Sequence, residues 1–451
     1  MNNPMWRYIW LATSLVVVVI LAYLGNSAIL SSPSFSIGPI LESAILTGGA
    51  LYLIFFLFIL VLRYSGLLFF SVSEHFVRVF TGNEHFISTQ VDPSSLPMVS
   101  IIVPAYNEGM VIEGALRYLL LLEYKNYEII VVDDGSTDDT YQKALATAAA
   151  DVGGRIRVIT KTNGGKAAAL NAGAAIARGD LILNMDGDTR LSKRALLNAV
   201  KHFDDPKVGG VAGNVKVLNR DNLLTNLQAL EYVEGLAMVR TAQGFMHMVS
   251  IVPGPIGIFR KSVLAQVGGY DSDTYAEDCD LTLKILISGW RISYESKSIA
   301  FVESPTKLLD LLQQRYRWTR GMLQALRKHS SQLWSPRRSG SNFLLLWYMA
   351  FEVIIWPFSS VFGSLFFIYI GVNQGLVTVL LFWWLQLTIL DVVAALYCII
   401  LEEEDIKLTL YVLLFRMFYI VIIDIVKVFA IIEECFGIGM TWGKLSRLGR
   451  L

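Results

Sequence analysis

The chain has 451 residues, of which 54% are hydrophobic and only 17% are charged, and its mean hydropathy is +0.51. This composition is more apolar than a soluble enzyme needs and predicts a membrane protein with a soluble part. Lysine plus arginine and aspartate plus glutamate both number 38, so no bulk electrostatic attraction to nucleic acid is expected. The three cysteines lie far apart, which argues against a disulfide scaffold and a zinc site.

Five apolar runs approach or exceed the length needed to cross a bilayer, which is about 20 residues. The first run is too long for a removed signal peptide, and the segment that joins the first two runs, Asn26 to Glu42, contains no Lys or Arg. The positive-inside rule therefore places the N-terminus and the central part of the chain in the cytosol, in a multi-pass protein of the cell membrane. The runs cover residues 6–23, 44–62, 343–369, 376–400 and 408–432.

These runs set the expected domain organisation. Residues 66–85 and 308–326 mix apolar and polar residues at helical spacing next to membrane runs, which favours interfacial helices; amphipathic helices packed on the soluble domain fit the pattern equally well. The expected parts are two transmembrane helices (1–63), an interfacial segment and linker (64–96), a cytosolic catalytic domain (97–306), interfacial helices (307–341), C-terminal transmembrane helices (342–434) and a cytosolic tail (435–451).

The tail poses a topological question. It carries Lys444, Arg447 and Arg450, and three crossings after the central domain would leave these cations outside the cell. The positive-inside rule disfavours that arrangement. We therefore expect either a fourth crossing, created by a break near Pro357, or one re-entrant segment.

The central domain has the pattern of an α/β fold. Short β-branched runs, each followed by turn residues, alternate with helix-like stretches, which predicts a doubly wound, mostly parallel sheet. Ligands of such sheets bind beyond the carboxyl ends of the strands, so chemistry is expected there. The expected strands are 99–103, 128–132, 156–159, 181–184 and 208–212, with helices at 111–122 and 167–178.

Carboxylates gather where these strands end. The first strand runs into Pro104–Glu108, the second into Asp133–Ser136 and the fourth into Asp186–Asp188. One acidic strand end fits a helix N-cap, and Ser136 or Asp138 fits that alternative. Three such ends together favour a nucleotide diphosphate sugar, which needs acceptors for its base and ribose and a divalent cation for its diphosphate.

Between these carboxylates, Asn163 to Lys166 form a turn that enters a helix of small residues. The helix N-terminus and the Lys166 ammonium could meet a phosphate or the nucleotide. A plain helix start is equally favoured by the pattern. The spacing of a P-loop is absent from this turn.

Taken together, the motifs resemble the processive family 2 glycosyltransferases, which are the synthases of cellulose, chitin, hyaluronan and poly-N-acetylglucosamine. The resemblance covers residues 97–326 and rests on the order P-x-Y-N-E, D-D-G-S, D-x-D, Y-A-E-D and Q-x-x-R-W, with agreeing membrane flanks. It implies a GT-A-type α/β domain inserted between transmembrane helices. The implied activity is inverting, processive transfer from a UDP-sugar to a growing polysaccharide, which the chain also translocates.

The resemblance also implies site residues. Asp278 would be the general base for the acceptor hydroxyl, and Asp186 and Asp188 would bind a divalent cation, Mg²⁺ or Mn²⁺. The alternatives are an acidic turn at residues 277–280 and an interfacial anchor at residues 317–318. The implied nucleotide-sugar site comprises Tyr106, Glu108, Asp133, Asp134, Lys166, Asp186, Arg317, Trp442 and Lys444, and the implied acceptor site comprises Gly254, Pro255, Glu277, Gln314 and Trp318.

Two features of the sequence qualify the resemblance. Residue 276 is Ala where the family usually has Thr or Ser, which leaves Asp278 intact but removes a hydroxyl group. The segment Val252 to Arg260 is more similar to the acceptor-side loop of hyaluronan and chitin synthases than to that of cellulose synthase. This similarity favours UDP-N-acetylglucosamine as the donor.

Several readings of function stay open at this stage. A non-processive family 2 transferase that makes a glycolipid, such as a ceramide type, is the main alternative, and a non-catalytic sugar-binding membrane subunit is the second. The intact carboxylates Asp186, Asp188 and Asp278 speak against the second. The expected partners are the UDP-sugar, the polysaccharide and the lipid bilayer, with no nucleic acid; the need for accessory subunits is not written in the sequence.

Overall fold

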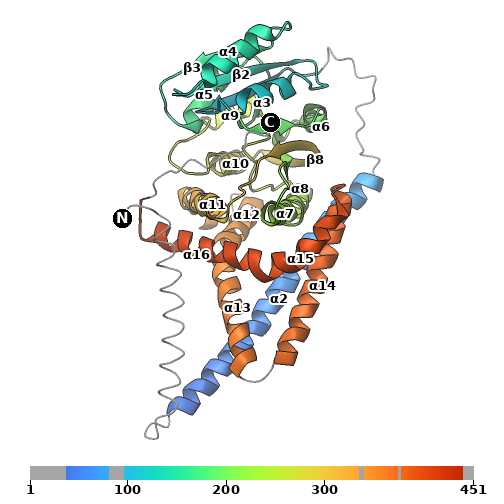
Figure 1. Ribbon diagram of the computed structural model, residues 1–451, viewed down its shortest axis with the longest axis vertical. Helices are drawn as coiled ribbons and strands as arrows, with labels where there is room; N and C mark the ends of the chain where they lie inside the picture. The colour runs from blue at the N-terminus through green and yellow to red at the C-terminus, as the bar shows by residue number, and fades with distance from the viewer. Residues whose placement is uncertain (1–36, 81–95, 335–339, 374–376, 440–451) are drawn as a thin grey trace. The chain divides into compact units, whose positions relative to one another are not determined.

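The computed structural model describes residues 37–80, 96–334, 340–373 and 377–439 (Figure 1). The chain forms two compact units, one of residues 1–63 with 359–384 and one of residues 64–358 with 385–451. The second unit contains the α/β domain. Each unit is described by itself below.

The core of the second unit is a sheet with eight strands among the described residues. Their order across the sheet is β3-β2-β1-β4-β7-β6-β8-β5. The strands are β1 (Val99–Ala105), β2 (Tyr127–Asp133), β3 (Ile156–Thr160), β4 (Leu181–Asn184), β5 (Thr189–Leu191), β6 (Val208–Val217), β7 (Gly257–Arg260) and β8 (Arg291–Val302).

The sheet is mixed: the expected parallel pairing holds among β1 to β4 and between β6 and β8, whereas the pairs that involve β5 or β7 are antiparallel. β1 pairs in parallel with β2 and β4, and β2 pairs in parallel with β3. β7 runs antiparallel to both β4 and β6, and β5 runs antiparallel to β8. Because the parallel strands β1 to β4 end at one edge, the acidic residues that follow β1, β2 and β4 lie at that edge.

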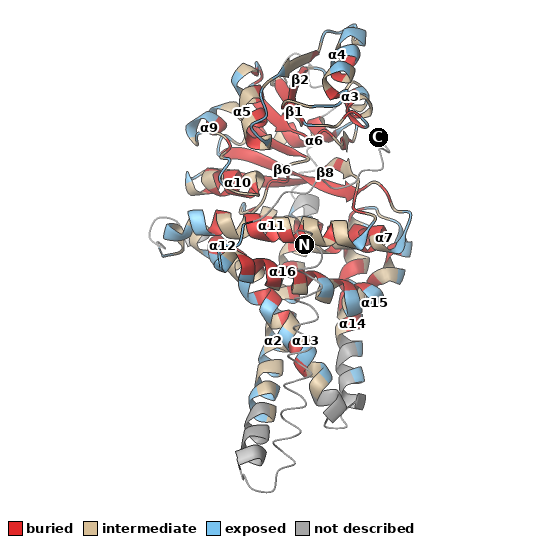
Figure 2. Cartoon of the chain, turned by 60° about the vertical axis from the view of Figure 1, so that its left-hand side comes forward, coloured by how far each residue is buried: buried red, intermediate tan, exposed pale blue. Residues whose placement is uncertain are grey.

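Alternating residues of the central strands build a core on each face of the sheet. Ile101 and Ile129 pack with Leu116 of α3 (Ile112–Leu119) on one face. Ile102 packs with Leu170 of α5 (Lys166–Ile176) on the other. This two-sided burial explains the continuous β-branched runs in the sequence, because a strand covered on both faces has no polar side (Figure 2).

Several helices complete the second unit. Figures 1 and 2 show α10 (Glu277–Ile287) and α11 (Leu308–Lys328) between the sheet and α16 (Ile420–Cys435). The remaining helices of the domain are shorter than α11. Their bounds are α4 (Thr140–Ala150), α6 (Ala195–Val200), η2 (Lys201–Asp204), α7 (Leu223–Leu230), η3 (Glu231–Ala237), α8 (Met238–Phe245), α9 (Lys261–Gln266) and η4 (Ser330–Trp334).

The helix α2 (Ile37–Phe80) is continuous through the expected membrane run at 44–62 and through residues 66–80 of the amphipathic segment, whose last residues lie outside the described ones. In the first unit its Tyr52 hydroxyl donates a hydrogen bond to the Ser359 carbonyl oxygen at 3.0 Å. By length and composition, the described part of the chain has two helices that could cross a membrane. They are Leu46–Val77 and Asn342–Tyr369.

The break expected at Pro357 is absent from the described backbone. α12 (Gly340–Ala350), the π-helical turn η5 (Phe351–Ile355) and α13 (Trp356–Asn373) follow one another without a gap. Proline lacks an amide donor, and the wider turn directly before Pro357 accommodates it without ending the helix. The next helix, α14, covers Val377–Leu401.

The last expected crossing, residues 408–432, is divided in the structure. Its residues belong to η6 (Ile406–Tyr411), α15 (Val412–Leu414), the π-helical turn η7 (Phe415–Tyr419) and α16 (Ile420–Cys435). Two charged pairs lie close by. Arg416 Nε is 3.2 Å from Asp391 Oδ2, and Lys427 Nζ is 3.0 Å from Asp424 Oδ1. The charges at 424 and 427 thus pair with each other.

The loop after α14 is attached to β6 by buried charges. Glu404 accepts from Lys216 Nζ at 3.1 Å and from Arg220 Nη1 at 2.5 Å. Glu402, whose side chain is also buried, accepts a hydrogen bond from Asn214 Nδ2. The sheet and the segment that follows α14 are therefore joined by ion pairs withdrawn from water.

Candidate active site

Two loops at the carboxyl edge of the sheet are bound to each other through Asn107. The side-chain oxygen of Asn107 accepts a hydrogen bond from the Thr137 backbone amide at 2.8 Å, and the backbone amide of Asn107 donates one to Ser136 Oγ at 2.9 Å. Asn107 has a φ of 54°, a left-handed conformation that Asn tolerates better than most residues. The loop after β1 is thereby fixed on the loop after β2, and Tyr106 beside it stays 43% exposed.

The two aspartates at the end of β2 are both buried. Asp134 Oδ2 accepts a hydrogen bond from the Gly165 amide at 2.7 Å, and Asp134 Oδ1 is 2.6 Å from Lys161 Nζ. Asp133 Oδ2 accepts from Thr160 Oγ1 at 2.9 Å. These carboxylates hold the turn that leads into α5, so they determine where the N-terminus of that helix lies.

The first residue of α5, Lys166, brings two distant carboxylates together. Its Nζ atom is 2.6 Å from Asp186 Oδ1, at the end of β4, and 2.9 Å from Glu277 Oε1, at the start of α10. Burial would lower the pKa of Lys166, but the negative charges of Asp186, Glu277 and Asp278 outweigh it and raise the pKa above its usual value. The lysine is therefore a cation at the centre of the site.

Asp278 lies beside this cluster, in the first turn of α10. Its Oδ2 atom accepts a hydrogen bond from the Gly254 amide at 3.2 Å, and its Oδ1 atom accepts one from the Cys279 amide at 2.8 Å. Burial and the neighbouring charge of Glu277 raise the pKa of Asp278 to about 6, although Lys166 acts in the opposite direction. A carboxylate with a raised pKa is a stronger base than an ordinary aspartate, which suits proton abstraction near neutral pH.

The donor set at Asp186 and Asp188 fits a divalent cation. Both side chains are half-buried carboxylates that follow one buried strand, and oxygen ligands of this kind are those that Mg²⁺ and Mn²⁺ prefer. Asp186 already carries a positive partner, the Lys166 ammonium, and its side chain remains 29% exposed. The expected metal residues are therefore chemically suitable and open to a ligand.

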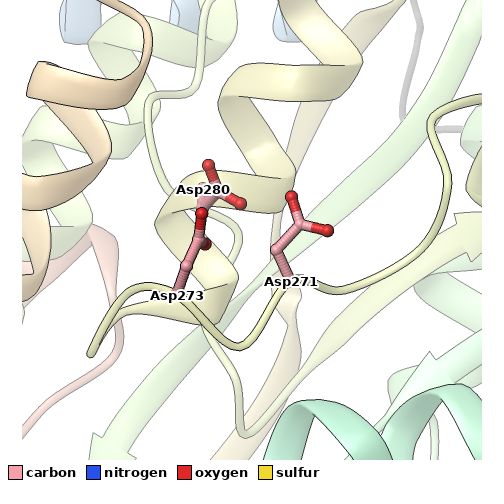
Figure 3. Close-up of side chains that lie close together, drawn as sticks. All are labelled: Asp271, Asp273 and Asp280. Atoms are coloured by element: carbon pink, nitrogen blue, oxygen red, sulfur yellow. The ribbon is translucent and has the colours of Figure 1, made fainter.

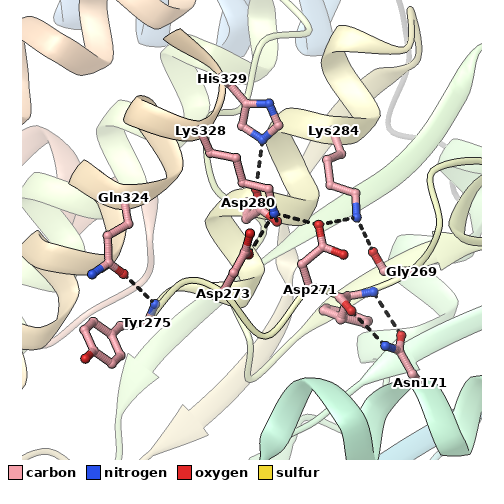
Figure 4. Close-up of polar contacts among 11 residues, drawn as sticks. Asn171, Gly269, Asp271, Asp273, Tyr275, Asp280, Lys284, Gln324, Lys328 and His329 are labelled. Atoms are coloured by element: carbon pink, nitrogen blue, oxygen red, sulfur yellow. Dashed lines mark hydrogen bonds and ion pairs between the residues drawn. The ribbon is translucent and has the colours of Figure 1, made fainter.

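A second acidic group looks like a metal site but is neutralised within the chain. Ligand atoms of Asp271, Asp273 and Asp280 lie within 4.8 Å of one another (Figure 3). Lys328 Nζ is 2.6, 2.8 and 2.9 Å from the three carboxylates, respectively (Figure 4). His329 also contacts Asp280 at 2.8 Å. The group thus anchors the end of α11 to α10 and its preceding loop.

Helix α11, which carries the Q-x-x-R-W motif, packs directly on the loop before Asp278. Gly321 has no side chain, and a Cβ atom there would lie 2.6 Å from Ala276 Cβ. One turn further on, Gln324 accepts a hydrogen bond from the Tyr275 amide at 3.0 Å (Figure 4). The structure therefore brings the Y-A-E-D loop and the Q-x-x-R-W helix into contact, as expected.

Within α11, Arg315 and Arg320 are buried, and Arg317, which the sequence assigned to the nucleotide-sugar site, is half-buried. The Arg315 guanidinium lies 4.3 Å from the centroid of the Trp318 ring. Its Nη2 atom is 2.6 Å from Glu231 Oε2, which also accepts a hydrogen bond from Tyr419 at 2.6 Å. This arrangement fixes one face of Trp318 by a cation–π contact. Sequence reasoning missed Arg315, Glu231 and Tyr419.

A small pocket opens beside the Glu277–Asp278 pair. Two of its polar atoms, Asn184 Oδ1 and the Tyr270 hydroxyl, are buried and have no hydrogen-bond partner among the described residues. The sequence offered no motif that singles out either residue. The lining residues are Leu170, Asn184, Val252, Pro253, Gly254, Phe259, Tyr270, Glu277 and Asp278.

The remaining expected site residues lie in loops, on α11 or outside the described residues. Glu108 is half-buried in the loop fixed by Asn107, and Pro255 is half-buried next to Gly254. Gln314 begins the Q-x-x-R-W motif on α11, and its Oε1 atom is buried. Trp442 and Lys444 lie outside the described residues.

The central domain is similar to known glycosyltransferases. Residues 100–268 match the sequence model of glycosyl transferase family 2. The chain is 32% identical over 232 residues to a poly-β-1,6-N-acetyl-D-glucosamine synthase from Staphylococcus aureus, and 28% identical over 263 residues to one from Staphylococcus epidermidis. The alignments cover 51% and 57% of this chain but only 56% and 61% of those relatives. The predicted resemblance to processive family 2 enzymes is therefore confirmed.

A solved structure supports the fold. A mannosyltransferase from Pyrobaculum calidifontis, in complex with GDP-Man and Mn²⁺, superposes with a TM-score of 0.59 and 19% sequence identity. The match covers 86% of this chain and all of that one. The central domain therefore has the GT-A fold expected from the sequence.

Proposed function

Because residues 100–268 carry a family 2 glycosyltransferase domain, we propose that this chain is a membrane-integrated, processive, inverting transferase that polymerises a β-linked polysaccharide from UDP-N-acetylglucosamine. The matched synthases of N-acetylglucosamine polymers support this donor. The observation that carries the proposal is the convergence of Lys166, Asp186, Glu277 and Asp278 at the carboxyl edge of the sheet, with α11 packed against them.

Proton abstraction is the step assigned to Asp278. An inverting transfer needs one base that takes the proton of the acceptor hydroxyl as this attacks the anomeric carbon opposite the leaving diphosphate. The raised pKa of Asp278, about 6, leaves it mostly ionised at neutral pH yet basic enough to accept the proton. The Gly254 amide orients the carboxylate by a hydrogen bond to Oδ2.

The donor would bind along the ends of β1, β2 and β4. The exposed ring of Tyr106 offers a stacking face for the base, and Asp133 and Asp134 lie beneath the same edge. A divalent cation held by Asp186 and Asp188 would neutralise the diphosphate as it leaves. Lys166 adds a positive charge close to that position.

The acceptor would lie on the side of the site that α11 forms. The ring of Trp318 is partly buried, and the Arg315 guanidinium holds it by a cation–π contact. A sugar that rests on this ring would be close to the loop of Asp278, because α11 contacts that loop through Gly321. Repeated transfer needs such a site for the non-reducing end.

The membrane arrangement follows from the helices after the domain. We infer one crossing by the helix Asn342–Tyr369 and a return crossing by α14, with residues 406–438 at the cytosolic interface. The apolar side chains of Leu410, Phe418 and Phe436 are more than half exposed, as a lipid-facing surface requires. Two crossings leave the basic tail in the cytosol, in a plasma-membrane protein, without a re-entrant segment.

Product analysis tests the proposal. The full chain, purified in lipid nanodiscs, is incubated with UDP-N-acetylglucosamine, UDP-glucose or UDP-glucuronic acid and Mg²⁺ or Mn²⁺. We expect UDP release with UDP-N-acetylglucosamine and a long polymer that linkage-specific hexosaminidases digest. A short glycolipid product would contradict the proposal and indicate a non-processive transferase. No UDP release with any donor would indicate a non-catalytic subunit.

A further inference from the structure

The Lys166 ammonium lies where an incoming cation is expected. It contacts the metal-binding candidate Asp186 at 2.6 Å and Glu277 at 2.9 Å, and Asp278 adds negative charge close by. In the structure, therefore, one positive group of the chain already compensates the carboxylates that the reaction needs.

Gly254 leaves room for this ammonium. A Cβ atom at Gly254 would lie 2.8 Å from Lys166 Nζ and 3.6 Å from Asp186 Oδ2. Any other residue at position 254 would crowd the lysine in its present position. The Gly254 amide also binds Asp278, so one residue with no side chain faces both the ammonium and the base.

A divalent cation at Asp186 and the ammonium in its present position are in conflict. Mg²⁺ binds carboxylate oxygens at about 2.0–2.1 Å, and the ammonium is 2.6 Å from Oδ1 of Asp186. Two cations this close repel each other strongly in a partly buried site. A diphosphate resolves the conflict, because its oxygens bind the divalent cation and also accept the ammonium.

We propose that Lys166 is a built-in counter-ion that occupies the cation position in the free enzyme, so that a divalent cation binds well only together with a nucleotide diphosphate. This inference rests on the proposed function, because it takes Asp186 as a metal ligand. It adds an order to binding: cation and nucleotide bind cooperatively, and the lysine moves from the carboxylates to the phosphates.

The chain contains a matched ion pair that serves as a control. Lys161 Nζ is also 2.6 Å from a carboxylate, that of Asp134. Asp134, however, is almost fully buried and accepts hydrogen bonds from the Gly164 and Gly165 amides, so its lysine has a structural role. Loss of charge at position 161 is therefore expected to leave cation binding unchanged.

Direct binding of Mn²⁺ tests the inference without turnover. Free Mn²⁺ is measured by electron paramagnetic resonance during titration of the purified full chain in nanodiscs, with and without UDP. We expect Lys166→Met to bind Mn²⁺ alone at least tenfold more tightly than the wild type does. We also expect that UDP increases the Mn²⁺ affinity of this variant by a smaller factor than it increases that of the wild type. Lys161→Met and the charge-preserving Lys166→Arg should behave like the wild type.

An unchanged or weaker affinity of Lys166→Met for Mn²⁺ alone would overturn the inference. Lys166→Gln provides a second neutral variant should the methionine variant fail to fold, which thermal unfolding reveals. Failure of the proposed function has a different signature, because wild-type protein that binds neither Mn²⁺ nor UDP would contradict the glycosyltransferase site itself.

Discussion

Gly321 of α11 lies directly against Ala276, two residues before Asp278, with space for no side chain between them. A Cβ atom at Gly321 would lie 2.6 Å from Ala276 Cβ, so the helix approaches the loop this closely because position 321 has no side chain. The position of the proposed base, Asp278, thus depends on how closely α11 packs.

Replacing Gly321 with Ala should slow the reaction. The added methyl group must push α11 away from residues 275 and 276. This movement increases the distance between Trp318, on the helix, and Asp278, on the other side of the contact. We expect at least a tenfold fall in kcat/KM, since misplacement by about 1 Å costs on the order of 10²-fold. Gly235→Ala is the matched control, because a Cβ atom there meets only Glu231 Cγ at 3.9 Å. Equal rates for the two variants would contradict the packing argument.

Asp278→Asn should abolish transfer and preserve UDP binding. Asparagine keeps the size of the side chain but cannot take up a proton, and general-base catalysis contributes about 10²–10⁴-fold. Initial rates of UDP release and a UDP-binding titration measure the two effects. Asp271→Asn, outside the proposed site, should retain activity. Retained polymer synthesis by Asp278→Asn would remove this residue from the role of base.

The pH dependence of kcat/KM should report the ionisation of Asp278. Because burial and Glu277 raise the pKa of Asp278 to about 6, its carboxylate is increasingly protonated below that pH. A protonated base is inactive, so kcat/KM should fall about tenfold per pH unit below 6 and level off above it. A rate independent of pH between 5 and 7 would be inconsistent with this assignment.

Glu231→Gln should destabilise the contact that holds Trp318. The Arg315 side chain is only 5% exposed, and loss of its partner charge leaves a buried cation poorly compensated. Breaking a buried pair in this way costs about 3–5 kcal/mol. Thermal unfolding in nanodiscs measures the loss, and the double variant Glu231→Gln, Arg315→Met should recover part of it. A Tm of the single variant equal to that of the wild type would refute the structural importance of the pair.

The pair of Asp280 and Lys328 should stabilise the fold without binding a metal. Burial alone would raise the pKa of Asp280, but hydrogen bonds from His329 and Lys328 outweigh it and hold the pKa below its usual value. The resulting stability is present above pH 4 and is lost as the pH falls through the folded-state pKa. Lys328→Met should lower the Tm at pH 7, and Asp273→Asn should leave Mn²⁺ binding unchanged. A weaker Mn²⁺ affinity of Asp273→Asn would show that these aspartates are ligands.

The sequence predicted one half of the sheet well and the other half poorly. β1, β2 and β4 are buried on both faces and therefore appear in the sequence as continuous apolar runs, whose positions agree with the structure. β8 was missed because Glu295 and Lys297 interrupt its apolar pattern. In the structure Glu295 is buried and paired with Lys201 at 3.0 Å, a partner that only the fold supplies.

The candidate site, too, could be predicted from the sequence only in part. The order of motifs predicted that Asp186, Glu277 and Asp278 share a region, and ion pairs through Lys166 bring the first two together. The choice between Arg315 and Arg317 depends on how α11 is rotated against Glu231, which spacing along one helix does not determine. Gly321 carried a usable signal, since a lone glycine inside a helical pattern usually has a packing reason.

The buried charges between β6 and the loop after α14 also constrain how this chain can change over time. Loss of Glu404 would remove the carboxylate partner of Arg220 and leave Lys216 with Glu402 alone, and loss of Lys216 would leave Glu402 without its cation. Single exchanges at these positions should be rare among homologous sequences, and the positions should vary jointly or not at all. An alignment deep enough to detect covariation should therefore show that the residues that join the loop to the sheet are inherited together.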